Sequence, residues 1–516
     1  MCTLWTLLLC TLLLTGCALP SLAGRSESAA LDRTQARTTP IGHALAPMLA
    51  AHPGLSGVYP LDNPRAAFAA RVFLARAAQR TLDVQYYIWH DDLTGTLLLE
   101  QLHEAADRGV RVRLLLDDNG IPPSLDATLA ALDAHPNIEV RLFNPFVVRK
   151  PKFVGFLTDF SRANRRMHNK SMTADSSATI VGGRNIGDEY FGATDGVVFS
   201  DLDVLAVGPA ASDVAQDFDR YWSSGSAYPV DRILRPVSAD HLGELAAKAQ
   251  SMQHDPAATA YANAVRDLPI AQQLPAGTLP LEWAKTRLVS DDPAKGLNEA
   301  SGDALVLRQL HDILGEPHEE LDLVSPYFVP NDAGVQYFTQ LAASGVSVRV
   351  LTNALEATDV AAVHSGYAKR RVALLKGGVQ LYELRRAASP DAAERGGKEH
   401  TGGFGSSGSS LHAKTFAVDS SRAFVGSFNF DPRSAKLNTE LGLIIDSPAL
   451  ASRITTTFHT VVPEMAYTVR LDHKDKLFWI AQDSNHERSY TTEPNTGWFK
   501  RLGVWFMSIL PIESYL

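Results

Sequence analysis

Two segments of the chain carry the same chemically reactive side chains at the same spacing. In each segment a lysine follows a histidine by two residues, an aspartate follows the lysine by five, and an asparagine follows the histidine by seventeen. The copies are His168, Lys170, Asp175 and Asn185, then His412, Lys414, Asp419 and Asn429. They begin 244 residues apart (412 minus 168). A lone His-x-Lys is usually surface decoration, but two matching sets in one chain are not expected by chance.

These residue types suit reaction at a phosphodiester. Residues i and i+2 of a strand face the same side, so we expect the histidine and lysine of each copy to point together. Ammonium and amide groups neutralise the non-bridging oxygens as charge develops on them. One histidine can attack phosphorus while the other protonates the leaving alcohol. The lysines supply the positive charge that a metal would otherwise bring, so we expect no metal and no cofactor.

The elements that must position these residues also occur twice. Their order is strand, helix, strand, at residues 82–87, 97–106 and 110–116 and again at 321–324, 337–343 and 346–351. Asp83 and Asp322 mark an offset of 239 residues (322 minus 83), and Gly109 and Gly345 close the two helices. Strands alternating with helices predict an α/β fold of two tandem domains, each a mostly parallel or mixed sheet flanked by helices. A pseudo-two-fold relation between the domains would bring both motif copies into one shared active site.

The bulk composition fits a packed globular protein with two core domains. The chain has 516 residues, of which 45% are hydrophobic and 20% charged. The net charge of −9 argues against a nucleic-acid partner, because phosphate backbones attract basic proteins. The cysteines are Cys2, Cys10 and Cys17, so the folded domains have no disulfide, thiol nucleophile or cysteine-bound zinc.

The composition changes along the chain predict its boundaries. The predicted segments are a signal peptide at 1–16, a tether at 17–45, a first domain at 46–235, a connecting segment at 236–290, a second domain at 291–465 and a C-terminal extension at 466–516. A Gly- and Ser-rich loop at 387–410 runs into the second motif, and its composition favours a surface insertion over a lid.

The N-terminus resembles that of a bacterial lipoprotein. Residues 4–14 form an apolar run of signal-peptide length, and Leu14-Thr15-Gly16-Cys17 resembles a lipobox. The resemblance implies cleavage before Cys17, lipidation of its sulfur and a cell-envelope location facing the periplasm. Ala18 is the residue type that favours the outer membrane over the inner one. No Lys or Arg precedes Cys17, which departs from the usual signal, and the alternative is an apolar stub of a core helix.

The paired motifs resemble the His-x-Lys-x4-Asp signature of the phospholipase D superfamily, over roughly residues 60 to 465. The resemblance implies a covalent phosphohistidine, with His168 as nucleophile and His412 as general acid and base. It also implies a carboxylate against each histidine ring, for which Glu440 and its repeat counterpart Asp201 are the candidates. The motif aspartates are expected to hold local structure. Asn185, Asn429 and Ser427 are the expected phosphate ligands, and Gly183 stands where the second copy has Ser427.

Three further stretches resemble the bacterial cardiolipin synthase C group: residues 200–209, residues 363–371 and the closing Leu510-Pro511-Ile512-Glu513. That resemblance implies transfer of a phosphatidyl group to phosphatidylglycerol, with phosphatidylglycerol or phosphatidylethanolamine as donor. The apolar and aromatic stretch 498–512 suits a membrane interface, although a C-terminal helix docked on the core would look similar.

Other functions remain open on sequence alone. Water as the acceptor would make the protein a phospholipase D. Arg162, Arg165, Arg166 and Lys170 beside the first motif would suit a periplasmic nuclease, against which the net acidity counts. A non-catalytic lipid-binding lipoprotein is the alternative of a different class, and both intact motifs count against it. The sequence indicates no oligomeric state.

Overall fold

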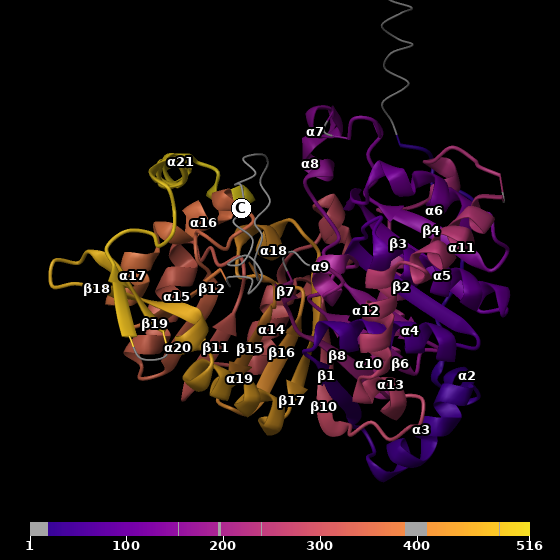
Figure 1. Ribbon diagram of the computed structural model, residues 1–516, viewed down its shortest axis with the longest axis horizontal. Coiled ribbons are helices and arrows are strands. Elements are labelled where there is room, and N and C mark those ends of the chain that lie inside the picture. Colours follow the sequence, from indigo (N-terminus) through magenta and orange to yellow (C-terminus); the bar gives the residue numbers. More distant parts are fainter. Residues whose placement is uncertain (1–18, 153, 195–197, 239, 387–409, 484–485) are drawn as a thin grey trace, which may run out of the picture.

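The computed structural model describes residues 19–152, 154–194, 198–238, 240–386, 410–483 and 486–516. Two α/β halves of related architecture lie side by side (Figure 1). The predicted signal peptide, Cys17 and nearly all of the predicted loop at 387–410 lie outside the described residues. None of the helices in the described part of the chain is long and apolar enough to cross a membrane.

One continuous sheet of eighteen strands runs through both halves of the described chain. In the first half the order is β9 (Ala227–Pro229), β4 (Ile138–Phe143), β3 (Arg111–Gly120), β2 (Thr81–Ile88), β5 (Ser171–Ala174), β6 (Ala178–Gly182), β8 (Asp203–Val207) and β1 (Ser56–Leu61). In the second half it is β10 (Glu282–Ser290), β17 (Leu441–Asp446), β16 (Arg422–Gly426), β15 (Thr415–Val418), β11 (Glu320–Val324), β12 (Ser347–Asn353), β13 (Gln380–Leu384), β18 (Ala466–Leu471), β19 (Leu477–Asp483) and β20 (His486–Tyr490). The antiparallel pair β1–β10 joins the halves, and the strand order on its two sides is the same. The predicted pseudo-two-fold repeat is therefore present in the topology.

The sheet is mixed, with its parallel pairs confined to the centre of each half. Strands β2, β3 and β4 are parallel, as are β11, β12 and β13, and the other pairs in the main sheet are antiparallel. Parallel neighbours need a crossover helix. The crossover helices are α5 (Leu93–Asp107), α6 (Asp126–Asp133), α15 (Asp332–Ala343) and α17 (Arg371–Lys376). Asp92 caps the start of α5 and Asn331 that of α15, while Gly109 and Gly345 follow their ends at positive φ, as predicted.

The structure divides the predicted connecting segment at 236–290 between the two halves. Strand β10 lies inside the predicted connecting segment, yet it pairs with β17 and is the counterpart of β1, so the second half begins near residue 282. The rest of that segment is helical, in α11 (Asp240–Gln253), α12 (Pro256–Arg266) and α13 (Pro269–Gln273). These helices pack on the first half, where the Tyr261 hydroxyl donates to the Phe191 carbonyl at 3.0 Å.

The predicted tether is largely packed against the first half. Arg232 donates to the carbonyl of Ser21 at 2.5 Å, and Arg141 donates to that of Ser26 at 2.7 Å. Arg113 donates to the carbonyl of Ser28 at 2.9 Å. Helices α2 (Arg33–Arg37) and α3 (Pro40–Ala51) follow. Composition gave no sign of this, because the three carbonyls named above belong to the backbone, which any residue offers.

Candidate active site

Each motif lies where one half of the chain meets the other. Residues 168–170 and 412–414 are extended segments just before β5 and β15 rather than inside a strand. The backbone N–H of His168 donates to the carbonyl of Thr439 in the second half at 2.9 Å. The backbone N–H of His412 donates to the carbonyl of Ser200 in the first half at 2.8 Å, beside the short parallel pair of β7 (Phe199–Ser200) and β14 (Ser410–Leu411). These bonds fix the two histidine segments across the domain boundary.

The carboxylates that orient the histidines are exchanged between the halves. Nδ1 of His168 lies 2.9 Å from Oε2 of Glu440, and Nδ1 of His412 lies 2.6 Å from Oδ2 of Asp201. An ionised carboxylate only accepts, so each imidazole donates its Nδ1–H and keeps the Nε2 lone pair for substrate. The sequence predicted both carboxylates, but not that each would serve the histidine of the other half.

Burial sets the protonation state of the two histidines. It lowers the pKa of His168 to about 4 and that of His412 to about 3, and the neighbouring lysine charges lower them further while the carboxylates raise them. Burial alone would raise the pKa of Asp201, but His412 and Lys414 outweigh it and hold that pKa at about 2. The site without substrate therefore holds neutral imidazoles beside ionised carboxylates.

The two lysines lie buried with the histidines. Burial lowers the pKa of Lys414 to about 8, and burial together with the charge of Lys414 lowers the pKa of Lys170 well below its usual value. Each ammonium group donates to the backbone carbonyl of its own motif histidine, at 2.5 Å for Lys170. When both lysines are protonated, their ammonium groups balance the carboxylates of Glu440 and Asp201. A phosphodiester adds one negative charge, which favours uptake of one proton by a histidine.

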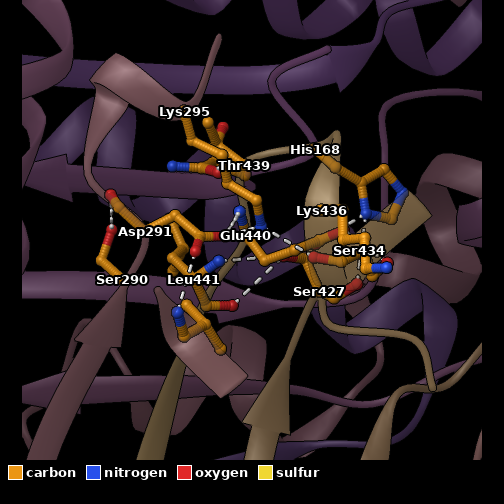
Figure 2. Close-up of polar contacts among 12 residues, drawn as sticks. His168, Ser290, Asp291, Lys295, Ser427, Ser434, Lys436, Thr439, Glu440 and Leu441 are labelled. Atoms are coloured by element: carbon orange, nitrogen blue, oxygen red, sulfur yellow. Dashed lines mark hydrogen bonds and ion pairs between the residues drawn. The ribbon is translucent and has the colours of Figure 1, made fainter. Parts of the chain in front are cut away.

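Glu440 is the centre of a buried polar network (Figure 2). Its carboxylate accepts from the hydroxyls of Ser427 at 2.5 Å and Ser434 at 2.7 Å. Its backbone N–H donates to Asp291 at 2.9 Å, and Asp291 forms a buried ion pair with Lys295 at 2.8 Å. Ser434, Asp291 and Lys295 were not predicted, because their only sequence signal is an Asp–Lys pair four residues apart.

Asp201 is held by other contacts than Glu440, and these explain why the first motif has Gly183 in place of a serine. A Cβ atom on Gly183 would lie 2.2 Å from Oδ1 of Asp201. Oδ1 accepts from the backbone N–H of Leu202 at 2.8 Å, and Arg184 donates to the Asp201 carbonyl at 2.6 Å. The shorter carboxylate leaves no room for the side chain that Ser427 has in the second copy.

Of the three predicted phosphate ligands, Ser427 and Asn185 are engaged with the protein. The Ser427 hydroxyl is used on Glu440 and accepts the backbone N–H of Leu441 at 3.0 Å, so in place of a phosphate contact it braces the carboxylate. The Asn185 amide accepts from the backbone N–H of Ile88 at 3.2 Å and donates to Tyr190 at 3.1 Å. Oδ1 of Asn429 is buried and has no partner among the described residues.

The motif aspartates brace the start of the central strands and do not reach the histidines. Asp175 accepts from the backbone N–H of Arg80 at 2.8 Å and of Thr81 at 2.9 Å, where β2 begins. Asp419 accepts in the same way from Glu319 at 2.8 Å, just before β11. Both aspartates have a φ of 50° in the turn of their hairpin.

Aromatic rings pack against the two imidazoles. The Tyr87 ring lies edge-on to His168 at 5.0 Å, and the rings of Tyr190 and Phe199 each lie 5.2 Å from His412. A cavity of about 840 Å³ borders Tyr87. Its other polar lining residues are His90, Asn119, Arg149, Lys150 and Lys152. Sequence analysis missed Tyr87, although it stands at the carboxyl end of a buried strand, where functional side chains collect.

One group of described residues has the makeup of a metal site. His90, Asp92 and Glu189 offer ligand atoms within 4.8 Å of one another. Asp92 is already occupied, because one oxygen caps α5 through Gly95 and the other accepts the backbone N–H of Asp188. His90 Nδ1 pairs with Glu189 at 3.1 Å. These bonds account for the cluster as a helix cap and an ion pair.

Comparisons with known proteins agree with the geometry. The family described as "Cardiolipin synthase, PLD-like domain" matches residues 73–222 and 310–462, one span in each half and each containing one motif. Cardiolipin synthase C of Escherichia coli strain K12 is 48% identical over 476 residues, which cover 92% of this chain and 99% of that protein. Cardiolipin synthase B of the same organism is 25% identical over 385 residues, 75% of each chain.

A solved structure shows the same fold. The crystal structure of phosphatidylserine synthase from Haemophilus influenzae Rd KW20 superposes with a TM-score of 0.56 at 13% identity, covering 92% of this chain and all of that one. The double motif, the duplicated topology and the near full-length similarity point the same way. The chain belongs to the phospholipase D-like family of cardiolipin synthases.

Proposed function

We propose that the protein makes cardiolipin by moving a phosphatidyl group from one phospholipid to the free glycerol hydroxyl of phosphatidylglycerol. As a member of its family it is a phosphatidyltransferase. The observation that carries the proposal is the pair of buried imidazoles, each with its Nδ1–H given to a carboxylate and its Nε2 left for substrate.

In the first step His168 is the nucleophile. Its neutral Nε2 attacks the phosphorus of the donor, phosphatidylglycerol or phosphatidylethanolamine, and a P–N bond forms as the P–O bond to the head group breaks. His412, protonated as the anionic substrate binds, gives its proton to the leaving oxygen. The ammonium groups of Lys170 and Lys414 stabilise the non-bridging oxygens, which carry the growing negative charge.

In the second step the head-group alcohol has left and phosphatidylglycerol takes its place. His412 accepts the proton of the attacking glycerol hydroxyl, a P–O bond forms and the P–N bond breaks. Cardiolipin leaves, and both histidines return to their starting protonation. Water in place of the hydroxyl would give phosphatidic acid.

The function is tested with purified protein and labelled phosphatidylglycerol vesicles, with and without phosphatidylethanolamine. We expect cardiolipin from the unchanged protein and none from His168→Ala or His412→Ala. Phosphatidic acid as the main product would make the protein a phospholipase D. The absence of any lipid product would contradict the proposal and direct the search to nucleic acid.

The roles of the histidines are tested with a donor whose leaving group needs no proton, phosphatidyl-p-nitrophenol. His412→Ala should release nitrophenolate and accumulate a phosphohistidine, because only the general acid is missing. His168→Ala should do neither. The reverse pattern would exchange the two assignments.

We also propose that the protein is anchored through Cys17 to the outer membrane of a bacterial envelope, facing the periplasm. The support is the lipobox-like Leu14-Thr15-Gly16-Cys17 followed by Ala18. Cells grown with labelled fatty acid should label the protein and not the Cys17→Ser variant. Label retained in that variant would contradict the anchor.

A further inference from the structure

The last long helix turns its large apolar side chains to solvent. Helix α21 (Trp498–Ile509) packs on α16 (Ala361–Ala368) with only Val504 buried, and Lys500 donates to the Leu355 carbonyl at 2.7 Å. The residues left exposed are Trp498, Phe499, Leu502, Trp505, Phe506 and Ile509, at 47–73% of their full accessibility. A helix that served only to cover the core would bury this face. The helix therefore contacts the protein along the side of Val504 and exposes its large apolar side chains to solvent.

A second apolar patch belongs to the first half. It lies on α7 (Val154–Thr158) and α8 (Phe160–Ala163), where Leu157 is 79% and Phe160 51% exposed. The Phe160 ring packs on that of Tyr515, at 5.8 Å between centroids, in the segment that follows α21. Arg433 donates to Asn164 and to the Tyr515 carbonyl, which fastens the two patches together.

Both patches lie on one side of the molecule, the side that carries the cavity beside Tyr87. Helix α7 directly follows the 149–152 segment that lines the cavity beside Tyr87. Helices α7, α8 and α21 all stand at the upper side in Figure 1. The first described residues of the chain also lie at this side, and Ser21 is fixed there by Arg232.

We propose that this face is a membrane-docking surface in which α21 and the α7–α8 pair each insert apolar side chains into a phospholipid bilayer. The inference rests on the proposed function, because the substrates are bilayer lipids. The net charge of −9 opposes attraction to an anionic lipid surface, so docking must come from apolar insertion. Helix α21 belongs to the second half and the α7–α8 pair to the first, so each half would contact the bilayer.

The first test measures insertion by the fluorescence of Trp498 and Trp505. The full-length protein is bound to phosphatidylcholine–phosphatidylglycerol vesicles in which a fraction of the acyl chains is brominated, because bromine quenches nearby indoles. We expect strong quenching in the unchanged protein, and its loss in Trp498→Phe/Trp505→Phe. Quenching should persist at high salt, since apolar insertion is not screened. Bilayer-bound protein whose Trp498 and Trp505 are not quenched overturns the proposal.

The second test separates docking from chemistry. Phe506→Ser/Ile509→Ser and Leu157→Ser/Phe160→Ser should each lower turnover on vesicles about tenfold, the effect of losing the burial of roughly one large side chain. Turnover on short-chain, monomeric phosphatidylglycerol should stay unchanged. Leu307→Ser is the matched control, because Leu307 is 47% exposed and belongs to α14 (Val306–Leu314), which lies well below α7, α8 and α21 in Figure 1.

The outcomes distinguish failure of this proposal from failure of the proposed function. Equal turnover of both variants and the control on vesicles overturns the docking surface, as does an equal loss on both substrates. Quenched tryptophans without any lipid product would leave the docking surface standing and overturn the phosphatidyltransfer.

Discussion

The hydroxyl of Ser434 influences the pKa of His168 through the carboxylate of Glu440. It donates to Glu440, which in turn accepts the Nδ1–H of His168. Removing that donor raises the proton affinity of the Glu440 carboxylate, which then pulls harder on the imidazole proton and raises the pKa of His168. We expect Ser434→Ala to move the acidic limb of the kcat/KM–pH profile upward by about one pH unit, because a hydrogen bond to a charged group has about that strength.

The control for this prediction is Ser223→Ala, which removes an exposed hydroxyl bonded only within its own helix. A Ser434→Ala profile lowered equally at every pH would mean that Ser434 only supports the local fold.

Lys414 limits activity on the alkaline side. Burial lowers its pKa to about 8, so its ammonium group loses the proton as pH rises through that value. The neutral amine cannot stabilise the phosphoryl oxygens, and kcat/KM should fall above about pH 8. In Lys414→Arg the guanidinium stays charged, so the loss near pH 8 should disappear even if the maximal rate is lower, while any loss from Lys170, whose pKa burial also lowers, remains. The same alkaline limb in both proteins would assign it to another group.

At the level of elements, the bend that follows β6 must pass the Asp201 carboxylate without a side chain at Gly183. Gly183→Ala would place a Cβ atom 2.2 Å from Oδ1 and push Asp201 away from His412. We expect kcat to fall at least about a hundredfold with the fold intact, as when the carboxylate partner of a catalytic histidine is lost. Gly243→Ala in α11 is the control, since nothing lies within 4 Å of its added methyl. Near-normal kcat in Gly183→Ala would show that the carboxylate can move without harm.

The motif aspartates act on stability. Asp175 accepts from the backbone N–H groups at the start of β2, of which that of Thr81 is buried, so Asp175→Ala leaves a buried donor unpaired. We expect a loss of about 2 kcal/mol in the free energy of urea unfolding, with kcat of the folded protein within a few-fold of normal. Asp303→Ala, whose side chain is 93% exposed, should change neither. A large loss of kcat without a loss of stability would place Asp175 in the chemistry.

The sequence predicted the elements better than the contacts between them. Repeated strands, helix-closing Gly109 and Gly345 and the two motifs follow from local periodicity and spacing, which a single chain displays. Strand β10 was missed because it joins the sheet through antiparallel pairs with β1 and β17, and so it lies outside the repeated strand–helix–strand pattern on which the prediction rested. The packing of residues 21–30 uses backbone carbonyls, and the partners of Glu440 converge from distant positions, so neither leaves a pattern in the sequence.

At the scale of the whole molecule, the exchange of carboxylates makes the two halves one catalytic unit. Glu440 of the second half holds His168, and Asp201 of the first half holds His412. The repeat in the sequence predicted a shared site, because duplicated topology brings equivalent edges together. It could not predict which carboxylate serves which histidine, since both arrangements have the same spacing along the chain. The antiparallel pairing of β1 with β10 holds the two halves in the arrangement in which the carboxylates are exchanged.

This arrangement predicts one covalent intermediate per chain despite two motifs. Both imidazoles serve a single phosphodiester, so a phosphatidyl group on His168 occupies the space that a second one on His412 would need. Acid-quenched protein, analysed intact by mass spectrometry during turnover, should carry one phosphatidyl adduct and never two. The double variant His168→Ala/His412→Ala should lose no more activity than either single variant, because residues that act as one unit are not additive. Two adducts on one chain, or activity that falls further in the double variant, would mean that each motif works alone and that the halves merely share a sheet.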